Sequence, residues 1–198
     1  KGQVVDAAMT DGSAILMNAI FGIMNRGGWS YDRGTNLLDG GAHFYGTYEA
    51  ADGKHVSIGS IEPQFYALLM EKTGLDSDPD FKAQMDRNEW PQLRTKLAAV
   101  MLTKTRDEWD AIMYGTDICY APVLNFEEAT ANKHNQDRAT FVEQDGITQA
   151  APAPRFSRTE PQLPPSAVAA GQQTDEILGS LGISDQAIAA LKSSGAIA

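Results

Sequence analysis

The chain has 198 residues, of which 42% are hydrophobic and 21% charged, and it carries a formal net charge of −10. This composition is typical of a soluble protein large enough to bury a substantial core, and the acidic balance argues against nucleic acid or an anionic membrane as a partner. The single cysteine, Cys119, excludes an internal disulfide and suits a reducing, cytoplasmic compartment. Within ICYAPVL it is predicted to be a structural thiol in a buried strand.

Residues 1–36 are predicted to form a helix and then an extended crossover. An apolar run from Val4 to Met17 has helical spacing, and repeated glycines break up the chain from Asn18 to Gly41. Such a loop is either a plain linker or a segment that lines a substrate, and the residues leave both readings open. His43 follows it, and a lone histidine here is more often a hydrogen-bonding residue than a base.

Residues 45–75 are predicted to form a β-hairpin followed by a helix. Two short strands flank the Asp52-Gly53 pair, which favours a tight turn. Pro63 favours the start of a helix and Gly74 its end. Three apolar side chains are expected on the buried face of this helix: Phe65, Leu68 and Leu69.

Glu62 stands where the second strand meets this helix, at a helix end that is partly positive. One interpretation is a helix-capping acid, which is common in that position. The other is an ionised carboxylate, fixed in direction, that orients a histidine or a substrate group. Its apolar and aromatic neighbours, including Ile61, and the nearby phenol of Tyr45 make a plausible wall of a site.

The following residues are predicted to be mainly helical, with one strand from Cys119 to Leu124. A helix opens at Trp90-Pro91, and Thr105 with Glu108 has the spacing of a capping box. With the hairpin these elements predict a small α+β domain over residues 37–143.

Residues 144–198 are predicted to form a proline-rich connector and two terminal helices. Thr174 and Ser184 are the expected caps of these helices. No two of the histidines have the spacing of metal ligands and there is no cysteine cluster, so no metal is assigned.

Four stretches carry a resemblance to a known family. The most specific is TYEAADGKHVSIGSIEPQFYALL, and the others are GQVVDAAMTDG, PAPRFSRT and TDEILGSLGISDQAIAALKSSGAI. Together they resemble the class III CoA-transferase family, and Ile61 to Tyr66 resembles its 2-methylacyl-CoA racemase branch. The resemblance implies an α/β protein whose nucleotide-binding-like large domain is mostly outside this chain. The chain would then be the C-terminal part of an enzyme.

The resemblance also implies an isomerase that racemises 2-methylacyl-CoA thioesters by 1,1-proton transfer through an enolate. The histidine and aspartate that move the proton are expected outside this chain, so the chain alone should be inactive. Glu62 matches the acid that orients that histidine, and Tyr45 and Ile61 match positions near the acyl group. No cofactor is expected beyond the CoA thioester substrate, and the family forms interlocked homodimers.

Two other functions stay open. One is transfer of CoA between carboxylic acids, the activity of other members of the family. The other is a non-enzymatic binding or interaction module, because the proton-transfer pair is not expected within these residues. The acidity of the chain also fits a phosphate-bearing CoA ligand poorly unless a local basic patch or helix N-termini receive it.

Overall fold

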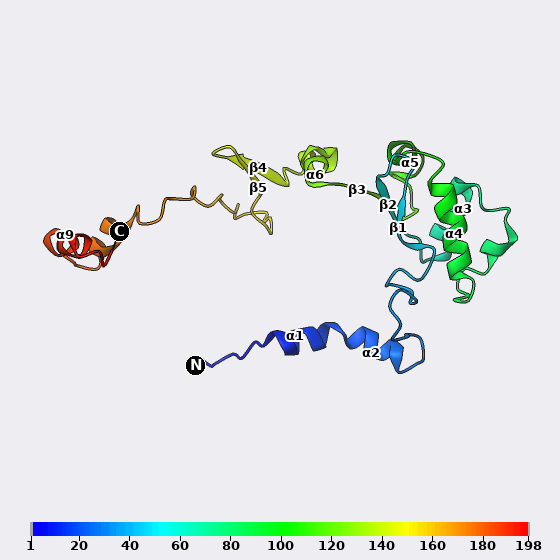
Figure 1. Ribbon diagram of the computed structural model, residues 1–198, viewed down its shortest axis with the longest axis horizontal. Coiled ribbons are helices and arrows are strands. Elements are labelled where there is room, and N and C mark those ends of the chain that lie inside the picture. The colour runs from blue at the N-terminus through cyan, green and yellow to red at the C-terminus, as the bar shows by residue number, and fades with distance from the viewer. Residues whose placement is uncertain (1, 198) are drawn as a thin grey trace. The chain divides into compact units, whose positions relative to one another are not determined.

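The computed structural model describes residues 2–197, which divide into two compact units (Figure 1). The first unit ends at Asn125 and the second begins at Phe126. Within the described residues no helix has the length and apolar character needed to cross a membrane. The division of the chain after residues 36 and 143 stays a prediction about its place in a larger protein.

The first unit is built on a three-stranded antiparallel sheet in the order β1-β2-β3. Its strands are β1 (Tyr45–Glu49), β2 (His55–Gly59) and β3 (Tyr120–Val123). The register places Thr47 opposite Ser57. Gly53 adopts a positive φ of 74° in the connecting turn, a conformation that costs glycine little. The predicted hairpin is therefore confirmed.

Three α-helices and a short 3₁₀ helix gather beside this sheet (Figure 1). They are α3 (Pro63–Thr73), η1 (Pro79–Lys82), α4 (Trp90–Met101) and α5 (Arg106–Met113). Helices packed with an antiparallel sheet confirm the expected α+β character of this region. Thr105 and Glu108 form the predicted capping box, in which the Glu108 amide donates to Thr105 Oγ1 at 3.3 Å.

The core lies between these helices and the sheet. Leu93, Leu97 and Met101 place one side of α4 in it, as the sequence spacing predicts. On α3 the prediction is partly wrong. Leu69 is buried, but Phe65 and Leu68 are only half-buried, and Tyr66 and Met70 take the inner positions. Tyr66 turns inward because its hydroxyl donates to the Phe81 carbonyl, 2.9 Å away on η1.

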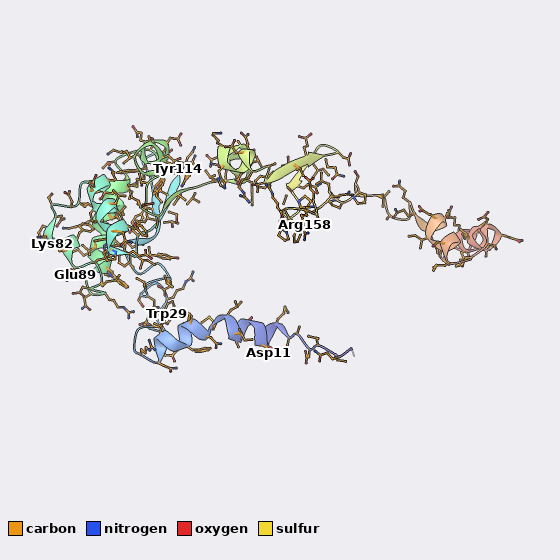
Figure 2. The ribbon with its side chains drawn as sticks, turned by 180° about the vertical axis from the view of Figure 1, so that it is seen from behind. Asp11, Trp29, Lys82, Glu89, Tyr114 and Arg158 are labelled. Carbon is orange, nitrogen blue, oxygen red and sulfur yellow. The ribbon has the colours of Figure 1, made fainter. Side chains whose placement is uncertain are left out.

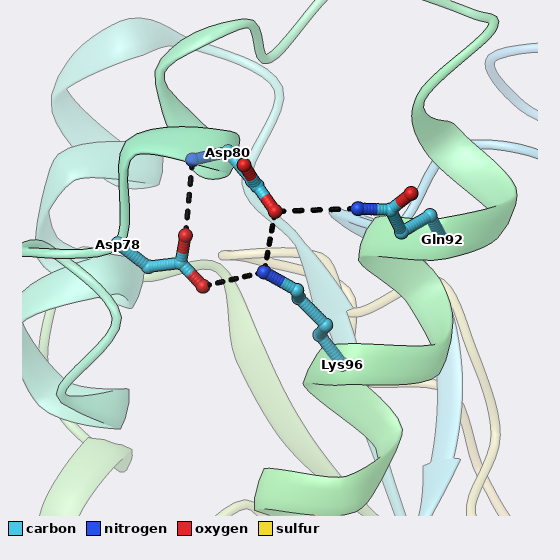
Figure 3. A network of polar contacts seen from close by, with 4 residues as sticks. All are labelled: Asp78, Asp80, Gln92 and Lys96. Atoms are coloured by element: carbon cyan, nitrogen blue, oxygen red, sulfur yellow. Dashed lines mark hydrogen bonds and ion pairs between the residues drawn. The ribbon is translucent and has the colours of Figure 1, made fainter.

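A polar network holds η1 against α4 (Figure 3). Lys96 Nζ on α4 lies 2.8 Å from Asp78 Oδ2 and 2.5 Å from Asp80 Oδ2. Gln92 donates to the same Asp80 oxygen at 3.2 Å. The hydrogen bond from Lys96, then that from the Asp80 amide, lowers the pKa of Asp78. The network fixes the segment that carries the Phe81 carbonyl.

The N-terminal part of the first unit has two helices whose side chains are not buried (Figure 2). They are α1 (Met9–Leu16) and α2 (Asn18–Met24). The expected crossover from Asn18 onward is therefore wrong over α2, where the chain stays helical through Gly22. Irregular backbone fills most of the stretch from Asn25 to Phe44.

The second unit contains four helices and a two-stranded sheet among its described residues. These are α6 (Phe126–Ala131), α7 (Lys133–Asp137), β4 (Phe141–Gln144), β5 (Ile147–Ala150), α8 (Thr174–Ser180) and α9 (Asp185–Ser193). The hairpin of β4 and β5 was not expected. Ser184 caps α9 as predicted, but Thr174 begins α8 without capping it.

Candidate functional site

The segment Gly59–Glu62, the corner, turns the chain from β2 into α3. Its backbone is fixed by neighbours that are distant in sequence. The Gly59 amide donates to the Cys119 carbonyl at 2.9 Å, and the Ser60 amide donates to the Phe44 carbonyl at 3.0 Å. Ser60 is fully buried, and its hydroxyl donates to the Ile118 carbonyl. The corner is thus anchored to both the β1 and the β3 side of the sheet.

Glu62 ends the corner at the N-cap position of α3, with extended backbone angles of φ −71° and ψ 144°. Its side chain is exposed and makes no capping hydrogen bond. Among the described residues its carboxylate has no hydrogen bond or ion pair. Glu62 therefore occupies the capping position, but its carboxylate accepts no hydrogen bond from the amides of α3. The carboxylate is free to contact another group.

Tyr45 lies beside the corner, as expected, because the first residue of β1 pairs with Gly59 at the end of β2. The Tyr45 ring covers Gly59, where a Cβ atom would lie 3.5 Å from Tyr45 Cε2. A shallow hollow of about 340 Å³ opens there. Its lining consists of Tyr45, Ser57, Ile58, Gly59, Cys119, Tyr120 and Ala121. Ile61 is absent from this lining and packs, half-buried, against the core.

Cys119 was predicted to be a structural thiol in a buried strand, and that prediction is wrong. The strand begins one residue later, at Tyr120, and the Cys119 side chain is exposed. Its backbone has a positive φ of 61°, which sequence patterns rarely reveal for a residue other than glycine. Desolvation, followed by the nearby carboxylates of Glu62 and Asp117, raises the pKa of the thiol.

The position of Cys119 gives a direct test of where the Glu62 carboxylate points. The thiolate is the form that iodoacetamide alkylates, so Cys119 should react slowly at neutral pH. Glu62→Gln should speed the reaction a few-fold, about as expected when a like charge is removed from beside the group. Alkylation rates across pH, read by mass spectrometry of the Cys119 peptide, measure this. Glu71→Gln on the far end of α3 is the matched control, and an unchanged rate in the Glu62 variant would mean that its carboxylate turns away.

His43 is a buried, hydrogen-bonded residue and not a base at the candidate site. Its side chain is fully buried, and Nε2 lies 2.9 Å from the Tyr66 hydroxyl. That hydroxyl gives its one proton to the Phe81 carbonyl, so the hydrogen between the two rings belongs to His43 Nε2. Burial, with a smaller contribution from the positive charge of Arg94, lowers the pKa of His43 to about 4. The ring is neutral at physiological pH and has no contact with Glu62.

Tyr45 and Cys119 thus share the hollow beside Gly59, and Cys119 also lies near the carboxylate of Glu62. Of these three residues, sequence reasoning selected Glu62 and Tyr45. The other histidines lie elsewhere. His55 pairs with Glu49 at the turn end of the hairpin, the end away from the corner, and His134 is on α7 in the second unit. No described histidine contacts Glu62, so an imidazole that meets its carboxylate has to approach from the exposed side of the corner.

Comparison with known proteins agrees with the resemblance seen in the sequence. The chain is 42% identical to the alpha-methylacyl-CoA racemase of Mus musculus over 196 residues, which are 98% of this chain and 51% of that protein. It is also 42% identical to the alpha-methylacyl-CoA racemase of Homo sapiens over 203 residues, with the same two coverages of 98% and 51%. The chain therefore spans about half the length of the curated relatives it matches.

A crystal structure of a CAIB/BAIF family protein from Brucella suis has the same fold. It matches with a TM-score of 0.64 at 18% sequence identity, covering 91% of this chain and 48% of that one. This likeness confirms the expected α/β class. The sequence model of the family described as CoA-transferase family III matches residues 1–174 of this chain. The chain belongs to CoA-transferase family III.

Proposed function

We propose that this chain is part of an isomerase that racemises 2-methylacyl-CoA thioesters. The observation that carries the proposal is the 42% identity to two alpha-methylacyl-CoA racemases along 98% of the chain. The geometry of the corner supports it. An unpaired, exposed carboxylate on a fixed backbone is suited to orient a histidine that moves a proton.

The reaction is a 1,1-proton transfer. A base removes the proton from the α-carbon, the electron pair of that C–H bond passes into an enolate, and an acid returns a proton to the opposite face. Two acid–base groups are needed, one on each face, with pKa values near the working pH. The thioester itself accepts the electron pair, so the proposal includes no cofactor beyond the CoA thioester.

Glu62 acts in this proposal without carrying the transferred proton. Its negative charge stabilises the protonated form of a histidine that lies against the corner, and its place on a fixed backbone lets it orient that ring, as the third group of a catalytic triad does. The hollow beside Tyr45 receives an apolar part of the acyl group. Ile61, which packs half-buried against the core, is proposed to lie near the acyl group from its place in the corner.

A single experiment distinguishes racemisation from CoA transfer. The complete protein that carries these residues is incubated with one epimer of a 2-methylacyl-CoA in heavy water. Racemisation gives deuterium at the α-carbon together with loss of chirality. CoA transfer gives a new thioester, and only with an acceptor acid, while the α-proton stays in place. Binding of the thioester with neither change would support a non-enzymatic module and refute the proposal.

We further propose that the complete protein works in the cytoplasm. The single cysteine of the chain supports this proposal, because it suits a reducing compartment.

We also propose that the complete protein is an interlocked homodimer. Many apolar side chains of the first unit are exposed on or beside α1 and α2 and need a partner surface. They are Val4, Val5, Met9, Ile15, Leu16, Met17, Phe21 and Ile23. A dimer would let a second subunit cover the corner and supply the missing imidazole.

Light scattering checks this assembly. The complete protein is expected to have the mass of a dimer, and the 198-residue chain alone is expected to aggregate. Replacing Leu16 and Phe21 by serine should improve the solubility of the isolated chain. A well-folded monomer of the complete protein would contradict the proposal.

A further inference from the structure

Gln84 joins the loop before α4 to the corner. Its side-chain Nε2 donates to the Ser60 carbonyl at 3.1 Å and to the Ile61 carbonyl at 2.9 Å. A side-chain amide nitrogen carries two hydrogens, and these two bonds use both of them. Because both acceptors are carbonyls, the orientation of the amide is fixed by its partners.

The two carbonyls that Gln84 binds accept no hydrogen bond from the sheet before them or from the helix after them. The hydrogen bonds of α3 begin at the next residue, where the Tyr66 amide donates to the Glu62 carbonyl at 3.0 Å. The ladder between β1 and β2 ends at the Tyr45–Gly59 pair. A backbone carbonyl that is withdrawn from water needs a partner, and Gln84 is the partner for both.

Gln84 is itself held firmly. The indole Nε1 of Trp90, a buried side chain, donates to the Gln84 carbonyl at 2.8 Å. The ion pairs of Lys96 with Asp78 and Asp80 fix the segment that leads into this loop (Figure 3). The donor therefore projects from a rigid support.

We propose that Gln84 is a positioning residue that sets the direction of the Glu62 carboxylate. No side-chain hydrogen bond holds that carboxylate among the described residues, so its direction depends on where the corner places the Cα–Cβ bond of Glu62. Gln84 binds the two peptide units immediately before it. The inference rests on the proposed role of Glu62, and it assigns a part in catalysis to a residue outside the corner.

The test replaces Gln84 by methionine, which keeps the length of the side chain and removes both donors. Assayed in the complete protein with a single-epimer 2-methylacyl-CoA, Gln84→Met should lower kcat by about 10- to 100-fold with little change in KM, since small misplacements of catalytic groups cost this much. The limb of the pH–rate profile that reports the histidine should move in the same direction as in Glu62→Gln.

Gln92→Met is the matched control. This variant also removes a side-chain amide and one hydrogen bond, to Asp80, but Gln92 makes no hydrogen bond to the corner, and the ion pairs of Lys96 still hold Asp78 and Asp80. It should keep kcat and the pH profile. Gln84→Asn, which retains the amide on a side chain one carbon shorter, should give an intermediate kcat. It also carries the test if circular dichroism shows that the methionine variant does not fold.

Alkylation of Cys119 provides a readout that needs no activity. If Gln84 positions Glu62, the methionine variant should change the alkylation rate toward that of Glu62→Gln, and Gln92→Met should not. This result supports the inference even if the wild-type protein exchanges no α-proton, in which case only the proposed function fails. Wild-type kcat together with wild-type alkylation in a folded Gln84→Met protein would overturn it.

Discussion

Replacing Glu62 with glutamine should lower kcat of the complete protein by roughly 10²-fold while leaving KM nearly unchanged. A general acid–base step contributes about 10²–10⁴-fold to a rate, and the carboxylate supports that step without touching the CoA ester. Glutamine keeps the shape of the side chain and removes its charge. The pKa of the histidine that meets the corner should fall, because no opposite charge then favours its protonated form.

Steady-state kinetics and pH–rate profiles with a 2-methylacyl-CoA substrate measure both effects. Glu71→Gln removes another exposed carboxylate, from the other end of α3, where it pairs with Lys72, and should leave both parameters unchanged. A drop in kcat at constant KM identifies an interaction made in the transition state. If the Glu62 variant keeps the wild-type kcat and pH dependence, the residue serves only to start a helix.

Two Asp-Gly pairs show how far local sequence signals reach in this chain. Asp52-Gly53 lies between alternating residues of strong strand preference, and the predicted hairpin is present. Asp145-Gly146 also forms a hairpin turn, with positive φ at both residues, yet no strand was predicted there. Its flanking strands are four residues each, and they adjoin the proline-rich stretch. The Asp-Gly pair predicts a turn equally well at both places, but the residues on either side of Asp145-Gly146 did not show a recognisable strand pattern.

The candidate site was predictable where it depended on local chemistry. Pro63 and Gly74 define α3, and hence place Glu62 at its N-terminus, through conformational preferences that act within a few residues. The placement of Cys119 was predicted wrongly and Gln84 was missed, because the carboxylate of Glu62 and the carbonyl of Ile61 that they meet are 23 or more positions away in the sequence. Sequence periodicity does not reveal the left-handed backbone at Cys119. It also does not reveal that the Gln84 amide bridges two carbonyls.

His43 should make the stability of the first unit strongly dependent on pH. Its Nδ1 is buried and has no hydrogen-bond partner among the described residues, so a proton there would be a buried, unpaired charge. The ordinary pKa of 6.5 applies to the unfolded chain, and the pKa in the folded chain is lowered to about 4. Between these values the unfolded state binds more protons than the folded state. Stability from this group is therefore present above about pH 6.5 and lost as the pH falls toward 4.

The expected loss from His43 across this window is about 3 kcal/mol in the free energy of unfolding. Urea unfolding of the chain that carries the solubilising changes Leu16→Ser and Phe21→Ser, followed by tryptophan fluorescence, measures it, since Trp90 and Trp109 are both buried in the same core. His43→Gln is the informative variant, because the glutamine amide can still donate to the Tyr66 hydroxyl but cannot take up a proton. This variant should remove most of the dependence of stability on pH above about pH 4.5, even if it is less stable than the wild type at every pH. Carboxylates such as Asp78, whose pKa is lowered, lose their stabilising contribution mainly below that pH. An equally steep loss of stability in the variant would show that another group, and not this imidazole, takes up the proton.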